Sequence, residues 1–194
     1  MSISLSLCMI DTFKLNVIDA LSNNINRIIQ NKDLKFINEG VIVFELSKCL
    51  TLLEKDKDRI SQNYPNFIDL SIVSQKLYIE VKYIRGIPSN KHIPVTNKFG
   101  QIINDMAKLA EKINEGFRIV IVVSDRRQID YFKNNDPRFV AGEGSIIIFD
   151  DLSRFDVLSI KDKIKYDLKK LRKVKLLRNV DLGELIILAY LINP

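Results

Sequence analysis

One stretch, residues 67–84, most constrains the fold of this chain. It reads FIDLSIVSQKLYIEVKYI, so two runs rich in β-branched and aromatic residues flank the short polar break Ser74-Gln75. This pattern is typical of two adjacent strands joined in a hairpin. Three charges interrupt the apolar runs: Asp69 in the first, and Glu80 and Lys82 in the second. Charges inside such strands require an explanation, because burying a charge costs free energy unless it is paired.

Strand geometry brings these three charges together. Side chains alternate between the two faces of a strand, so Glu80 and Lys82 point the same way. If the turn consists of Ser74 and Gln75 alone, Asp69 lies opposite Glu80 on that face. A loop with an odd number of residues would move Asp69 to the other face, so the prediction requires an even loop or a compensating bulge.

The three side chains have the composition of a divalent-metal site. Two carboxylates in contact repel one another unless a cation lies between them, and such hard oxygen ligands suit Mg²⁺ or Mn²⁺. A lysine beside them can help to activate a water molecule, or neutralise negative charge that develops on a phosphate. The structural alternative is an ion pair of Glu80 and Lys82 on a solvated face of the sheet, with Asp69 as a third surface charge.

The motif of Asp69, ten intervening residues and Glu80-Val81-Lys82 resembles that of the PD-(D/E)xK nuclease superfamily, which includes restriction endonucleases and archaeal Holliday-junction resolvases. The chain departs from the literal motif, because Pro65 stands four residues before Asp69. The resemblance implies an α/β fold with a mixed central sheet flanked by helices.

The activity implied by the resemblance is divalent-metal-dependent hydrolysis of DNA, with Mg²⁺ or Mn²⁺ as the cofactor. Asp69, Glu80 and the carbonyl oxygen of Val81 would bind the metal. Lys82 would activate water or stabilise the pentavalent phosphate. Because one such site cuts one strand, a homodimer is expected.

A further carboxylate is implied on the helix that precedes the hairpin. Apolar spacing predicts this helix from about residue 38 to residue 54. Glu45 follows an aromatic residue there, as in the family, and is the candidate for an additional metal ligand. Glu39 is the competing candidate, and a solvated helix charge is the structural alternative.

A basic loop is predicted directly after the hairpin. Residues 85–98 contain Gly86, two prolines and four basic or histidine side chains without regular periodicity. Phosphate contacts by Arg85, Lys91 or Lys98 would position a nucleic acid without reading its sequence. Gln101, near the start of the next helix, is a further candidate for this surface.

The rest of the chain is predicted to complete a single domain, residues 1–194, around a nuclease-like core at about 38–123. Within this core, a helix at 99–116 and a strand at 117–123 are predicted to follow the hairpin. The additional elements are predicted as a helix at 11–30, a short helix at 124–134, a strand at 145–149, a basic helix at 159–178 and a buried or dimer-forming helix at 182–192.

Composition favours a polyanionic partner. The 194 residues carry a formal net charge of +6, which leans toward DNA but does not distinguish it from RNA. We expect no membrane association and a reducing, cytoplasmic setting, because no apolar span or signal peptide is evident and the two cysteines form no metal-type motif. The alternative function is a non-catalytic basic DNA-binding or assembly protein on the same fold.

Overall fold

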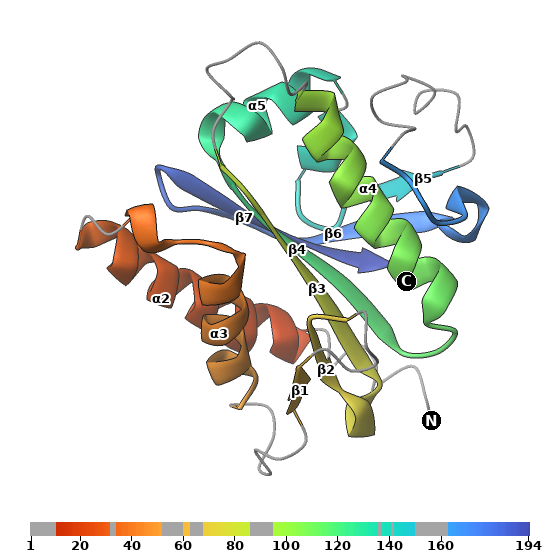
Figure 1. Cartoon of the computed structure of the whole chain (residues 1–194), viewed down its shortest axis with the longest axis horizontal. Coiled ribbons are helices and arrows are strands. Elements are labelled where there is room, and N and C mark those ends of the chain that lie inside the picture. Colours follow the sequence, from red (N-terminus) through yellow and green to blue (C-terminus); the bar gives the residue numbers. More distant parts are fainter. Residues whose placement is uncertain are drawn as a thin grey trace.

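A seven-stranded sheet organises the part of the chain that the structure describes (Figure 1). The computed structural model describes residues 11–31, 34–51, 60–62, 68–85, 95–135, 137–140, 142–149 and 163–194. The strand order is β1-β2-β3-β4-β7-β6-β5. The strands are β1 (Ile60–Gln62), β2 (Leu70–Ile72), β3 (Leu77–Ile84), β4 (Phe117–Asp125), β5 (Ile146–Ile148), β6 (Lys173–Asp181) and β7 (Leu185–Ile192).

Helices pack on both sides of this sheet. The α-helices are α2 (Asp19–Gln30), α3 (Glu39–Leu50), α4 (Val95–Lys112) and α5 (Arg126–Asn135). A π-helical turn, η1 (Phe13–Ile18), precedes α2, and short 3₁₀ turns are η2 (Leu34–Phe36), η4 (Val73–Gln75), η5 (Pro137–Val140) and η7 (Leu168–Lys170). Strands β3 and β4 run parallel, whereas every other neighbouring pair is antiparallel. The predicted α/β class, a mixed sheet flanked by helices, is therefore confirmed.

The sheet separates two hydrophobic cores. Helices α4 and α5 contribute to the core on one face, and η1, α2 and α3 contribute to the core on the other. Side chains of β4 alternate between the two cores. Val120 and Val122 pack in the core on the α4 side, and Ile119 and Ile121 pack in the core on the α2 side. This explains why β4 is a continuous apolar run rather than an alternating one.

The two C-terminal helices predicted from the sequence are wrong where the structure describes them. Residues 173–181 and 185–192 form the hairpin β6–β7, and residues 159–162 lie outside the described part. All eight residues of β7 are buried, as expected for a short apolar run with both faces covered. In β6, Lys173 and Lys175 alternate with the buried Val174, which is the two-residue period of a strand.

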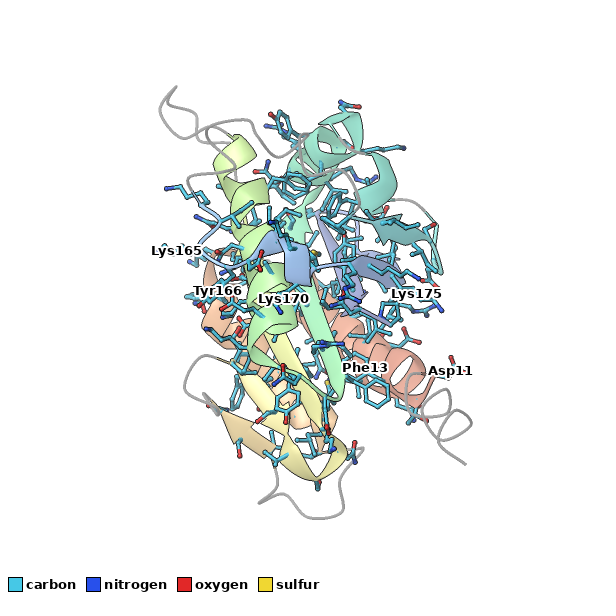
Figure 2. All side chains as sticks on the ribbon, turned by 90° about the vertical axis from the view of Figure 1, so that its right-hand side faces the viewer. Asp11, Phe13, Lys165, Tyr166, Lys170 and Lys175 are labelled. Atoms are coloured by element: carbon cyan, nitrogen blue, oxygen red, sulfur yellow. The ribbon has the colours of Figure 1, made fainter. Side chains whose placement is uncertain are left out.

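The segment before β6 crosses the outer surface of α4. The backbone N–H groups of Lys165 and Asp167 donate to Asn104 Oδ1 at 2.7 Å and to Glu111 Oε2 at 2.8 Å. Figure 2 turns this side of the molecule toward the viewer, with Lys165, Lys170 and Lys175 labelled. The segment predicted as a basic helix thus carries Lys165 and Lys170 as exposed residues, but it forms no α-helix where the structure describes it.

Within the described part of the chain, no helix has both the length and the apolar character needed to cross a membrane.

Candidate active site

The hairpin has the predicted register with a different turn. Leu70 pairs with Ile79 and Ile72 with Leu77, a register that sets Asp69 opposite Glu80. The connection is the 3₁₀ turn η4 followed by Lys76 in the left-handed conformation (φ 50°), rather than the expected two residues. Because this four-residue loop is also even, Asp69 keeps the expected face.

Two carboxylates close the edge of β3 where β2 stops pairing with it. Backbone N–H groups alternate between the edges of a strand, so those of Val81 and Tyr83 point to the same open edge. Val81 N donates to Asp69 Oδ2 at 2.8 Å, and Tyr83 N donates to Glu39 Oε2 at 3.3 Å. The missing ladder partners are therefore replaced by acidic side chains that flank Lys82.

Lys82 lies between two carboxylates from different helices. Its Nζ is 3.4 Å from Glu39 Oε2, at the start of α3, and 3.3 Å from Asp105 Oδ2, in the middle of α4. Burial lowers the pKa of Lys82, but the charges of Asp105 and Glu39 together raise it above its usual value. The ammonium group is consequently held both charged and in a defined position.

Glu80 is the most deeply buried acid of this group, with 3 % of its surface exposed. Burial, and then the charge of Asp69, raise the pKa of Glu80 to about 8, although the ammonium group of Lys108 at 2.8 Å opposes the shift. Burial also raises the pKa of Asp105, against the opposing effects of Lys82 and Lys108.

We call these six side chains the carboxylate–lysine cluster: Glu39, Asp69, Glu80, Lys82, Asp105 and Lys108. Asp105 and Lys108 were not predicted. The sequence does contain an indication of their burial: two charges three residues apart lie within the apolar stripe of α4, beside Met106 and Leu109. Among the residues that the structure describes, no three Asp, Glu, His or Cys side chains are already grouped around a point that could hold a metal ion.

Glu45 does not contact this cluster. Its carboxylate binds Lys48 Nζ at 2.8 Å and Asn24 Nδ2 at 3.0 Å, beside a small pocket of about 210 Å³ between α2 and α3. Six positions along an α-helix are about one and two-thirds turns, so Glu39 and Glu45 cannot share a face. The structure therefore brings the competing candidate, Glu39, to Lys82.

Of the residues predicted to contact nucleic acid, Arg85 and Lys98 lie together. Lys98 Nζ donates to the carbonyl oxygen of Arg85 at 3.0 Å, and Arg85 donates to the carbonyl oxygen of Leu34 at 2.8 Å. Burial lowers the pKa of Lys98. Gln101 is exposed on α4, and Lys91 lies outside the described residues.

The fold and the site thus define an α/β protein with a mixed sheet and a carboxylate–lysine cluster at the open edge of β3, in which Glu80 and Asp105 are buried. Comparison of the chain with protein-family models, with curated proteins and with solved structures gives no match.

Proposed function

We propose that the protein is a divalent-metal-dependent nuclease that hydrolyses DNA phosphodiester bonds. The observation that carries the proposal is the convergence of Asp69, Glu80 and Lys82, with Asp69 fixed by Val81 N and Lys82 held by Glu39. The order α3, β1, β2, β3, α4, β4, with β3 parallel to β4, supports a restriction-endonuclease-like core.

The donor chemistry of the cluster fits Mg²⁺ or Mn²⁺. Asp69 and Glu80 are hard oxygen donors whose negative charges lie close enough for Asp69 to raise the pKa of Glu80. Asp69, Glu80 and the carbonyl oxygen of Val81 would hold the ion. Glu39 would hold the ammonium group of Lys82 beside it. When bound, the ion would supply Lewis acidity and a nucleophilic water.

The role of Lys82 follows from its own environment. A lysine whose pKa is raised by two carboxylates stays protonated at neutral pH, so it is a poor general base. It is suited to stabilise the negative charge of a phosphate in the transition state. Glu39 and Asp105 are positioning residues in this mechanism, because they fix the ammonium group without needing to touch the substrate.

Cleavage of a panel of plasmid, linear duplex, single-stranded and four-way-junction DNA tests the proposal, in Mg²⁺, in Mn²⁺ and in EDTA. We expect metal-dependent cutting by the wild type and a loss of at least about 10²-fold in folded Asp69→Asn and Lys82→Met proteins. Cutting that survives both substitutions would remove the proposed site.

Helix α3 provides a matched pair of variants for the positioning role. Glu39→Gln should lower kcat by roughly tenfold with little change in KM, because it loosens Lys82. Glu45→Gln changes the same residue type on the same helix, away from the cluster, and should cut as the wild type does. Equal activity of the two variants would exclude a role for Glu39.

The second candidate function is a basic DNA-binding or assembly protein without catalysis. It is favoured by the net charge of +6 and by the two lysines that already neutralise buried acids of the cluster. Calorimetric titration with Mn²⁺ separates the candidates, since only the nuclease requires a Mn²⁺ site that Asp69→Asn weakens.

The remaining parts of the proposal concern assembly and setting. A homodimer would let two sites cut two strands of a duplex, and RNA remains an alternative substrate with the same chemistry. We propose a cytoplasmic location, which the buried free thiol of Cys49 supports.

A further inference from the structure

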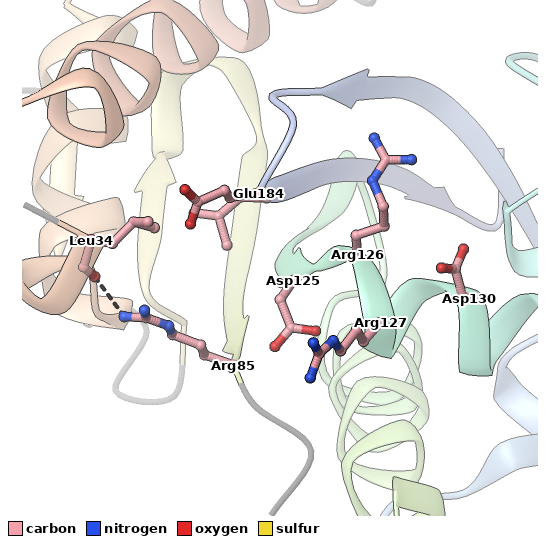
Figure 3. Close-up of a pocket in the computed structure, with 8 residues that line it drawn as sticks. Leu34, Arg85, Asp125, Arg126, Arg127, Asp130 and Glu184 are labelled. Carbon is pink, nitrogen blue, oxygen red and sulfur yellow. Dashed lines mark hydrogen bonds between the residues drawn. The ribbon is translucent and has the colours of Figure 1, made fainter. Parts of the chain in front are cut away.

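A pocket of about 500 Å³ opens where the parallel strands β3 and β4 end (Figure 3). Arg85 follows β3, Asp125 ends β4, and α5 begins immediately with Arg126 and Arg127. Crevices outside the carboxyl ends of parallel strands are common ligand sites in α/β proteins. None of the six residues of the carboxylate–lysine cluster lines this pocket.

Two of the three arginines in this pocket are held by backbone carbonyl groups. Arg85 donates to the carbonyl oxygen of Leu34 at 2.8 Å, and Arg126 donates to that of Gly183 at 3.3 Å. Arg126 also pairs with Asp181. Each guanidinium group has five N–H donors, so these contacts leave donors available to an anion.

Arg127 is the most available of the three. Its side chain is exposed, and among the described residues it has neither a hydrogen bond nor an ion pair. An exposed arginine in a concave surface is well suited to bind a phosphate, because its planar fork matches two phosphate oxygens.

Three acidic side chains also line the pocket: Asp125, Asp130 and Glu184. Asp125 Oδ1 accepts from Gln128 N at 2.9 Å and so caps α5. Asp130 and Glu184 are exposed on α5 and on the β6–β7 connection. The lining therefore carries three carboxylates as well as three arginines, so an anion has to contact the guanidinium groups directly.

The pocket lies beyond the end of β3, the strand that carries Glu80 and Lys82 of the cluster. Arg85 follows Lys82 by three residues, which is roughly 10 Å along a strand and about the axial rise of three nucleotides. Lys98 Nζ donates to the carbonyl oxygen of Arg85 at 3.0 Å, so a further ammonium group lies at the end of β3.

We propose that this arginine pocket binds a backbone phosphate of the nucleic-acid strand about three nucleotides from the bond that is cut. The inference rests on the proposed nuclease function for the identity of the strand. It adds Arg126 and Arg127 to the substrate-binding surface and makes Arg127 the principal phosphate contact.

Binding of a fluorescent 20-base-pair duplex, measured by anisotropy in EDTA over a range of salt, tests the pocket without cleavage. We expect Arg127→Glu to weaken binding by roughly tenfold at low salt, and Arg127→Gln to weaken it less and to reduce the salt slope by about one. Lys133→Glu, the same charge change on an exposed residue of α5 outside the pocket, should stay within about twofold of the wild type.

The outcomes separate this inference from the proposed function. Equal weakening by Arg127→Glu and Lys133→Glu, or none by either, would overturn the pocket even if the wild type cuts DNA. Selective weakening by Arg127→Glu in a protein that never cuts would support the pocket and remove the nuclease. Circular dichroism of each variant is the control for an intact fold.

Discussion

Glu80 is an acid that folding moves from water into the protein interior. Burial is the largest cause of its shift, and it raises the pKa of Glu80 from 4.5 to about 8. Lys108 lies at 2.8 Å and supplies the counter-charge for the ionised form. The protonation state of Glu80 is consequently coupled to the free energy of unfolding.

This coupling predicts how stability changes with pH. Between pH 4.5 and about 8 the folded protein binds the proton of Glu80 more tightly than the unfolded chain does. The contribution of Glu80 to the free energy of unfolding is therefore fully present below pH 4.5. It is lost as the pH rises toward 8, by an amount on the order of a few kcal/mol. Urea unfolding at pH 5, 6.5 and 8 should show this decline in the wild type and a flatter profile in Glu80→Gln.

Glu115→Gln is the control for the pH series. Glu115 is exposed, and its pairing with Lys76 lowers its pKa, so its contribution runs in the opposite direction, being lost as the pH falls. Its substitution should leave the decline between pH 5 and pH 8 in place. Parallel profiles for the wild type and Glu80→Gln would contradict the assignment of the decline to Glu80.

At the scale of elements, the turn between β2 and β3 packs closely against the start of β4. Gly116 adopts φ +98°, and a Cβ atom there would lie 2.1 Å from the carbonyl oxygen of Lys76. The same oxygen accepts from Phe117 N at 2.8 Å. This contact begins the parallel register of β3 and β4, which pairs Leu77 with Phe117.

Gly116→Ala should therefore be strongly destabilising. The substitution combines an unfavourable left-handed conformation with a backbone clash, so we expect a loss of at least about 3 kcal/mol in the free energy of unfolding. Gly144→Ala isolates the conformational part, since Gly144 has φ +85° and open space around its Cβ position, and should cost about 1–2 kcal/mol. Equal losses measured by urea unfolding would show that the close approach to Lys76 is unimportant.

The elements that the sequence predicts correctly have a strong local signal. The hairpin register follows from alternation and an even loop, and β4 follows from its continuous apolar run. The C-terminal hairpin lacks such a local signal. Strand β7 lies between β4 and β6, and its pairing with β4 joins residues that are far apart in the sequence. An apolar run of eight residues does not itself distinguish a buried strand from a short helix.

The site shows the same division between local and distant information. Asp69, Glu80 and Lys82 lie on one hairpin, so their spacing alone predicts their proximity. The choice between Glu39 and Glu45 depends on how α3 is rotated against β3, which is a tertiary property. Asp105 and Lys108 depend on the packing of α4, and only their position within an apolar stripe indicates that they are buried.

At the scale of the whole molecule, β7 connects the two hydrophobic cores. It pairs with β4 on one side and with β6 on the other, and all its residues are buried. Ile187 belongs to the core beneath α2 and α3, whereas Leu188 belongs to the core beneath α4 and α5. The segment predicted as an addition to a core at 38–123 is thus part of the centre of the sheet.

Two adjacent substitutions in β7 test whether these cores unfold together. Ile187→Ala and Leu188→Ala should each lower the free energy of unfolding by about 2–5 kcal/mol, because each leaves a cavity in a different core. Since both cores share one sheet, either substitution should reduce hydrogen-exchange protection in α3 and α4 alike, under conditions in which exchange proceeds by global unfolding. If Ile187→Ala weakened protection only in α2 and α3, the two cores would be separate folding units. Loss of protection on both faces would instead show that the carboxylate–lysine cluster depends on β7 for its stability.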